Sequence, residues 1–220
     1  MDRALQIINL GKKDFSDFYK LNNRLWLQRL ANDISDALVF VDHPHVIIRG
    51  NQDQSQEIKF PYAMARREEI NVSQVDWAGK TTYRGPGQLI IYPVIHLQRH
   101  GLTFEEITEK MENVLLRLLH RYGIKAHTLP SGGGIGVDGY RIASIEWEAP
   151  QNVTRFSIAL NVNPRLSLLR MFNLETGAVK GVTSMYSILK KKIDVRMLKD
   201  HFVSQVQREF GYKDEDVSCF

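Results

Sequence analysis

TYRGPGQLIIYP, at residues 82–93, joins a glycine-rich loop to the most apolar strand expected in this chain. Gly85 and Gly87 flank Pro86 in the loop. Glycine reaches backbone conformations that other residues avoid and lets the main chain touch a ligand, while proline stiffens a turn. The glycine-proline-glycine triplet alone fits a tight turn between two strands. The polar residues around it favour the wall of a ligand pocket, although the Gly-Lys-Ser/Thr ending of a phosphate-binding loop is missing.

The segments on either side show the periodicities of helices and strands. Apolar residues recur at helical spacing over residues 15–30, 103–122 and 195–210. The middle helix starts at Thr103 with Glu106 three residues on, which is the pattern of a capping box. Strands are predicted at residues 5–10, 37–41, 71–76 and 88–95, and residues 46–48 lead into a loop. The β-rich segments 135–137, 141–147 and 154–162 indicate an antiparallel meander.

This pattern predicts an α+β fold, with one domain over residues 1–220 and a central mixed or antiparallel sheet flanked by helices. The chain has 220 residues, 43% of them apolar and 25% charged, which is ordinary for a globular protein. No apolar run approaches the length of a membrane span, and the N-terminus lacks a signal-like apolar core. We expect a monomer in the cytoplasm, or in the mitochondrial matrix if the source is eukaryotic.

Cysteine and histidine usage argues against a metal site. Cys219 is the only cysteine, so neither a disulfide nor a thiolate metal site can form within one chain. The seven histidines show no ligand spacing, and a structural role is the better interpretation of His43. We expect no metal and no cofactor.

The formal net charge of +4 and the pI of about 9.1 fit either a solvated basic surface or an acidic macromolecular partner. The basic residues are spread along the chain, and no basic-aromatic RNA signature or zinc-finger spacing occurs. Composition does not separate nucleic acid from an acidic carrier protein as the partner, and we expect no nucleic-acid partner. An acidic carrier protein remains compatible with the charge.

Three further segments stand out. PSGGGIGV at residues 130–137 fits a connection before a strand, because it lacks the spacing of a dinucleotide site. In ALNVN, at residues 159–163, Asn161 could hold a loop through side-chain hydrogen bonds or bind a ligand. In GVTS, at residues 181–184, Thr183 or Ser184 is suited to cap a helix.

Together these segments resemble the lipoyl(octanoyl) transferases of the lipoate/biotin protein ligase superfamily, from about residue 10 to residue 210. TYRGPGQLIIYP resembles the hallmark TYHGPGQLxxYP, ALNVN and GVTS match in order, and Asp42-His43-Pro44 with Gly50 resembles an early family segment. The resemblance implies a lipoate/biotin ligase-like fold and transfer of an octanoyl group from acyl carrier protein to a lysine of lipoyl-domain proteins. In the family, a cysteine thioester carries the acyl group beside an assisting lysine. The substrate-binding positions that the resemblance implies are Gly79, Thr82, Tyr83, Arg84, Gly85, Gly87, Gln88, Ile145, Ala159, Asn161 and Gly177.

The sequence departs from the family at its catalytic pair. Arg141 occupies the position of the lysine. The position of the cysteine falls on Glu175 without a gap, or on Thr176 if Gly177 aligns with the family glycine. Arginine supplies charge but no general base near neutral pH, and glutamate and threonine are poor replacements for a thiol. One hypothesis is that Arg141 and Glu175 form a bidentate ion pair.

Other changes surround the hallmark. Arg84 replaces its histidine, Trp77-Ala78-Gly79 replace an Arg-Gly-Gly, and Glu146 replaces a glycine. Two functions stay open. The first is an acyltransferase that positions a thioester for direct attack by a lysine, with Arg84 or Arg141 polarising the carbonyl. The second is a non-catalytic relative that binds an acyl group or carrier protein. An ATP-dependent lipoate ligase is disfavoured by Arg141, and Cys219 could act only if its tail reached the pocket.

Overall fold

The computed structural model describes residues 4–51, 66–77, 81–130, 133–172, 179–212 and 217–219. An eight-stranded sheet runs through the molecule in the order β11-β1-β2-β6-β10-β9-β8-β7, and a three-stranded sheet has the order β4-β3-β5. The large sheet consists of β1 (Leu5–Lys12), β2 (Asp36–Asp42), β6 (Gln88–Val94), β7 (His127–Thr128), β8 (Gly134–Val137), β9 (Tyr140–Glu148), β10 (Arg155–Asn161) and β11 (Val217–Cys219). The small sheet consists of β3 (Val46–Arg49), β4 (Asn71–Gln74) and β5 (Thr82–Arg84).

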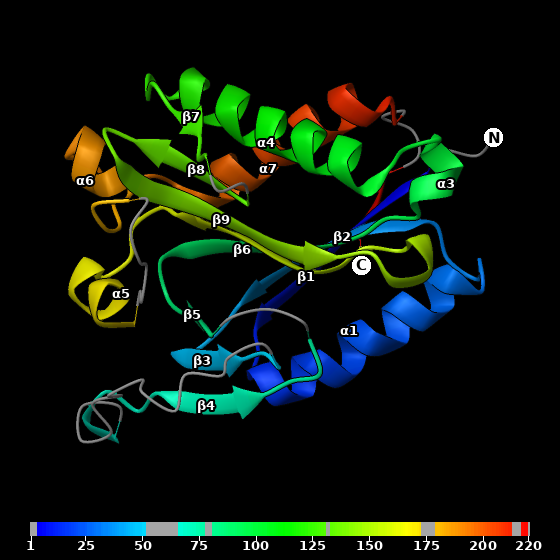
Figure 1. Cartoon of the computed structure of the whole chain (residues 1–220), viewed down its shortest axis with the longest axis horizontal. Coiled ribbons are helices and arrows are strands. Elements are labelled where there is room, and N and C mark those ends of the chain that lie inside the picture. The colour runs from blue at the N-terminus through cyan, green and yellow to red at the C-terminus, as the bar shows by residue number, and fades with distance from the viewer. Residues whose placement is uncertain are drawn as a thin grey trace.

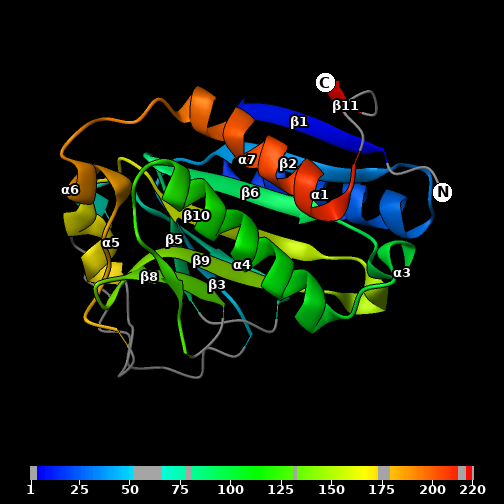
Figure 2. The same ribbon diagram turned by 90° about the horizontal axis from the view of Figure 1, so that it is seen from above.

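Helices cover the large sheet on both sides. The long helices are α1 (Phe15–Leu30), α4 (Phe104–Arg121) and α7 (Val195–Phe210), and the short ones are α3 (Leu97–His100), α5 (Leu166–Phe172), α6 (Met185–Leu189) and the 3-10 turn η1 (Pro150–Asn152). Figure 1 shows α4 and α7 on one side of the large sheet, and α1 with the small sheet on the other. In Figure 2, α4 and α7 lie above the strands. Among the described residues, no helix combines the length and apolar character needed to cross a membrane.

Helix α4 forms where its capping signal predicts. The Thr103 hydroxyl accepts a hydrogen bond from the Glu106 backbone N–H at 3.2 Å, and the Glu106 carboxylate accepts one from the Thr103 N–H at 2.7 Å. These bonds satisfy donors that the first helical turn leaves unpaired. A buried apolar stripe packs this helix onto the sheet, made of Ile107, Met111, Val114, Leu115, Leu118 and Leu119. Burial of each such side chain contributes about 1.5–3 kcal/mol before entropic costs.

The strand pairing confirms the predicted meander and mixed sheet. Strands β8, β9 and β10 pair antiparallel in sequence order, and β10 continues antiparallel onto β6. Strand β1 pairs parallel with β2, so the sheet is mixed. Residues 46–49 differ from the prediction, because they form β3 between β4 and β5 rather than only leading into a loop. Val46, Ile47 and Ile48 are buried there, and this tertiary packing is invisible in so short a run.

A buried carboxylate ties distant parts of the fold together. Asp36, at the start of β2, accepts hydrogen bonds from Arg29 of α1 at 2.7 Å, from His100 of α3 at 2.6 Å and from the Tyr212 hydroxyl at 2.7 Å. Burial pushes the pKa of Asp36 upward, but the hydrogen bonds from His100 and Arg29 outweigh it and hold the pKa below its usual value. The segment after α7 is thereby joined to the sheet through an ionised group.

Candidate active site

Three motifs of the sequence, the glycine-rich loop, ALNVN and GVTS, meet through a short chain of hydrogen bonds. Gln88, at the end of the glycine-rich loop, donates from its side-chain amide to the Asn161 carbonyl oxygen at 3.0 Å. Asn161 in turn donates from its own amide nitrogen to the backbone carbonyl of Thr183 at 3.1 Å. Gln88 also accepts from the Gly85 N–H at 2.9 Å. Asn161 therefore holds loops in place, which was one of the two roles predicted for it.

Gly87 lies so close to the backbone just after β10 that any side chain at this position would collide with it. Its φ is +86°, in the region that favours glycine, and its carbonyl accepts hydrogen bonds from Val162 N–H at 3.1 Å and Asn163 N–H at 2.8 Å. A Cβ at this position would lie 2.5 Å from the carbonyl oxygen of Asn163. The loop can approach the ALNVN segment so closely only because residue 87 has no side chain.

We call one side of the large sheet the small-sheet face, since it is turned toward β3–β5 in Figure 1. Side chains alternate along a strand, so paired residues of antiparallel strands share a face. The small-sheet face carries Ser157, Ala159 and Asn161 of β10, their partners Glu146 and Ser144 of β9, and Ile90 and Gln88 of β6. Gln88, Ala159 and Asn161 of the resemblance thus share one surface.

Arg84 of β5 lies against this face and is buried, with 1% of its surface exposed. Its guanidinium forms an ion pair with Glu146, with Nη2 2.9 Å from Oε2. The Ser157 hydroxyl accepts from Nε at 3.2 Å and from Nη2 at 2.9 Å. Nη1 donates to the Thr82 hydroxyl at 2.7 Å and to the Tyr83 carbonyl at 3.0 Å, and the Thr82 hydroxyl donates to Glu146 Oε1 at 3.1 Å.

This network uses the full donor capacity of Arg84. A guanidinium has five N–H groups, and the five hydrogen bonds above account for all of them. Arg84 therefore has no donor left for a substrate carbonyl, which argues against the polarising role predicted for it and leaves Arg141 as the other predicted candidate. The sequence alone presented Arg84 and Glu146 as two separate departures from the hallmark, 62 positions apart, whereas the structure pairs them. Their opposite charges were the only signal that could have suggested it.

Tyr83 and His45 lie on the other side of β5. The Tyr83 hydroxyl and His45 Nδ1 are 2.5 Å apart. Burial raises the pKa of Tyr83 and lowers the pKa of His45, so a neutral hydroxyl donates to a neutral imidazole. Tyr83 packs in a small apolar cluster with Ile47, Ile70, Leu168, Leu169 and Val182. Its side chain packs within this cluster.

His43 has the structural role that the sequence predicted. It is 1% exposed, with Nδ1 2.8 Å from the Lys13 carbonyl and Nε2 2.9 Å from the Tyr92 hydroxyl. Burial lowers the pKa of His43 to about 4. Since a carbonyl only accepts, Nδ1 carries the proton and Nε2 accepts from Tyr92.

Arg141 lies at the start of β9 and is joined to the GVTS segment. Its N–H donates to the Gly181 carbonyl and its carbonyl accepts from the Thr183 N–H, both at 2.9 Å. A Cβ built on Gly134, which pairs with Ser144, would lie 3.6 Å from Arg141 Nε. The Arg141 side chain is therefore beside the small-sheet face, at the opposite end of β9 from Glu146.

The remaining predicted site residues lie on both faces of the large sheet or outside the described residues. Ala159 is on the small-sheet face, whereas Ile145 pairs with Ile158 on the opposite face. Helix α4 packs on that opposite face, where Trp147 Nε1 donates to the Thr108 hydroxyl at 3.1 Å. Ile145 could therefore contact a ligand on the small-sheet face only through its backbone. Gly79, Glu175, Thr176 and Gly177 lie outside the described residues, so the Arg141–Glu175 pair remains a prediction.

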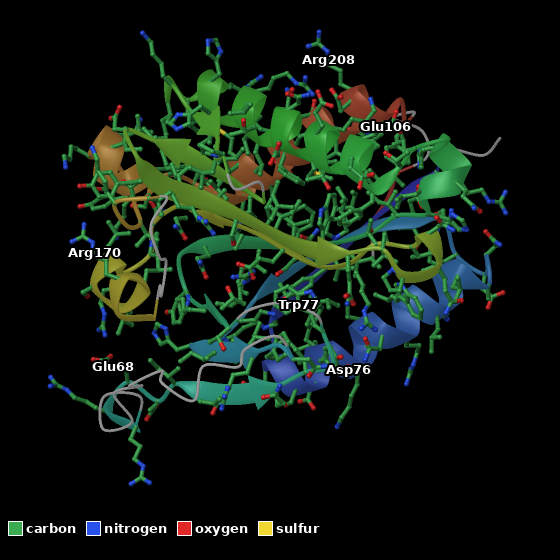
Figure 3. The ribbon with its side chains drawn as sticks, viewed as in Figure 1. Glu68, Asp76, Trp77, Glu106, Arg170 and Arg208 are labelled. Atoms are coloured by element: carbon green, nitrogen blue, oxygen red, sulfur yellow. The ribbon has the colours of Figure 1, made fainter. Side chains whose placement is uncertain are left out.

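Two other residues clarify the surroundings of the site. Trp77 is 5% exposed, and Figure 3 shows it between the large and small sheets. Cys219 belongs to β11, where its backbone pairs with Ile7 at the edge of the large sheet. Four strand spacings of about 4.8 Å separate β11 from β10, so the backbone of Cys219 is roughly 19 Å from the motif strands. That placement argues against Cys219 as the nucleophile.

Comparison with known proteins agrees with this fold. Residues 16–207 match the model of the lipoyl protein ligase A/B catalytic domain. The octanoyltransferase of Alkaliphilus metalliredigens is 30% identical over 210 residues, covering 94% of this chain and 96% of its own. That of Desulforamulus reducens is 27% identical, covering 97% and 94%. The bi-partite lipoate protein ligase of Thermoplasma acidophilum superposes with a TM-score of 0.71 at 11% identity, covering 100% of this chain and 86% of that one.

The fold and the assembled motifs thus define a lipoate-ligase-like domain. More particularly, the chain belongs to the lipoyl protein ligase A/B catalytic-domain family, and its relatives there include octanoyltransferases.

Proposed function

We propose that this protein is an acyltransferase of protein lipoylation, which moves an octanoyl-type group from acyl carrier protein to a lysine of a lipoyl domain. The observation that carries the proposal is the chain of hydrogen bonds from Gln88 through Asn161 to Thr183, which joins three family motifs. Relatives that align over nearly the whole chain are octanoyltransferases, and this supports the same acyl donor and acceptor.

The proposed reaction is direct aminolysis of a bound thioester. The ε-amine of the acceptor lysine attacks the thioester carbonyl, a C–N bond forms, the C–S bond breaks, and the carrier thiol leaves with a proton. Arg141 stabilises the developing oxyanion, because a fixed positive charge beside the carbonyl lowers the barrier. Holding the two reactants together supplies a large part of the acceleration. No enzyme thioester is needed in this route.

Mass spectrometry of the acceptor tests the proposal. Purified protein is incubated with octanoyl-acyl carrier protein and an apo lipoyl domain, and the lipoyl domain is then weighed. The expected result is an octanoyl mass gain in the presence of the protein, lost in Arg141→Ala and partly kept in Arg141→Lys. A hydroxylamine-sensitive acyl adduct on the protein itself would contradict direct transfer. Absence of any mass gain, where an authentic octanoyltransferase works, would favour a binding protein without turnover.

A further inference from the structure

The small-sheet face of β9 and β10 is a strip with polar groups at its ends and small side chains in its middle. At one end lies Arg141, and at the other lie Arg84, Glu146 and Ser157. Between them Ala159 pairs with Ser144. Small side chains would let an extended ligand lie close to the strands.

The hydrogen bonds of Arg84 indicate which end of the strip would hold the carbonyl of an acyl group. All five N–H groups of Arg84 are bonded within the protein, so Arg84 cannot receive the acyl carbonyl. The carbonyl therefore belongs at the Arg141 end. Strand β9 has a bulge here, because Arg141 pairs with Gly136 whereas Ala143 pairs with Ile135. Measured along the paired strand, Arg141 is two positions, about 7 Å, from Ser144 and about four positions, roughly 13 Å, from Glu146.

The length of an acyl chain can be compared with this strip. An extended chain advances about 1.3 Å per bond for a C–C bond near 1.5 Å, so eight carbons span about 9 Å. A chain that starts beside Arg141 therefore passes Ser144 and ends before Glu146, whose side chain is next along the strip. The far end of the acyl group meets a charged residue rather than an apolar wall.

Glu146 still has hydrogen-bonding capacity at that point. Its side chain is 21% exposed, and within the described part of the chain its carboxylate accepts one hydrogen bond on each oxygen, from Thr82 and from Arg84. A carboxylate offers about four acceptor positions. A terminal methyl group placed against it would remove water from the unused positions without replacing the lost hydrogen bonds.

We propose that the Arg84–Glu146 pair makes the site selective for an acyl group that carries a hydrogen-bond donor, such as a hydroxyl, at its far end. This inference rests on the proposed function, because it assumes an acyl group along the strip. Arg84 fixes the carboxylate of Glu146, and Glu146 accepts the donor of the ligand. A hydrogen bond to a charged acceptor corresponds to about a tenfold to hundredfold preference over the unsubstituted chain.

Calorimetric titration of the full chain with octanoate and with 8-hydroxyoctanoate tests the inference. The wild-type protein is expected to bind 8-hydroxyoctanoate at least about tenfold more tightly. The double variant R84H/E146G removes both charges, and the preference is expected to disappear. E146Q removes only the charge and keeps the shape of the side chain, so it provides a second measurement of the preference if the double variant folds poorly. Circular dichroism establishes whether each variant is folded.

Glu148 offers a matched control on the same strand. It forms an ion pair with Arg155 at 2.7 Å, two positions beyond Glu146, and its exposed fraction of 27% is similar. E148Q is expected to leave the preference unchanged. Tighter or equal binding of octanoate by the wild-type protein would overturn the inference, as would a preference that persists in both Glu146 variants. If octanoate binds and the lipoyl domain is octanoylated without such a preference, only this inference fails. If neither acid binds, this inference is overturned, and the transfer assay described above tests the proposed function separately.

Discussion

Arg84 and Glu146 should be energetically coupled, and Arg84→Met measures this most directly. The substitution removes five hydrogen bonds from a side chain that is 1% exposed and leaves Ser157, itself fully buried, without its donor. Breaking a buried ion pair by removing one partner costs about 3–5 kcal/mol. For a domain of this size, each kcal/mol shifts the melting temperature by roughly 2–4 °C, so we expect a decrease of about 6–20 °C.

Substitution of Glu146, the partner of Arg84, is expected to lower the free energy of unfolding by less. Glu146 is 21% exposed, so water can replace part of what it loses, and Glu146→Gln should cost about 1 kcal/mol. In Arg84→Met/Glu146→Gln the second change removes a charge that has already lost its partner. The double variant should therefore cost about 1–2 kcal/mol less than the sum of the single variants.

Urea unfolding at pH 7.5 of the wild type and the three variants completes this cycle. The slope of each transition must stay constant for the free energies of unfolding to be compared. Additive free energies within about 0.5 kcal/mol would refute an energetic link between the two residues. A loss below about 1 kcal/mol in Arg84→Met would refute the buried, fully bonded guanidinium itself.

Three further predictions concern the loop, the histidine and the C-terminal segment. Gly87→Ala should lower the melting temperature clearly more than Gly101→Ala and should abolish acyl transfer. Both glycines have positive φ, but of these two only residue 87 has backbone atoms within 4 Å of an added Cβ. Thermal melting and the transfer assay compare the two variants. His43 stays neutral down to a pKa of about 4, whereas the unfolded chain takes up a proton near pH 6.5. Stability should therefore fall as the pH drops through this window, by up to about 3 kcal/mol, and His43→Gln should flatten the slope in denaturant titrations. Tyr212→Phe removes one donor from the buried carboxylate of Asp36 and should cost about 1–3 kcal/mol in urea unfolding, while an unchanged midpoint would show that this bond does not fasten the segment.

Local signals in the sequence were sufficient for the long elements. The capping box at Thr103 and the apolar period after it predicted α4, and the alternating segments predicted β8, β9 and β10. Such signals depend on residues within a few positions of each other, so they can be read without knowing the fold. The strand formed by Val46–Arg49 was missed because its partners come from β4 and β5.

The sequence by itself determined the family pattern and the gathering of polar, glycine-rich motifs around residues 82–93. Only the tertiary structure decided what those residues do to one another. Arg84 and Glu146 are 62 positions apart in the chain, and each looked like an isolated change until β5 and β9 placed them 2.9 Å from each other. Ion pairing depends on distance in space and on burial, and neither is encoded locally. The same fold assigns Asn161 to holding the loops together and puts the backbone of Cys219 at the far edge of the sheet.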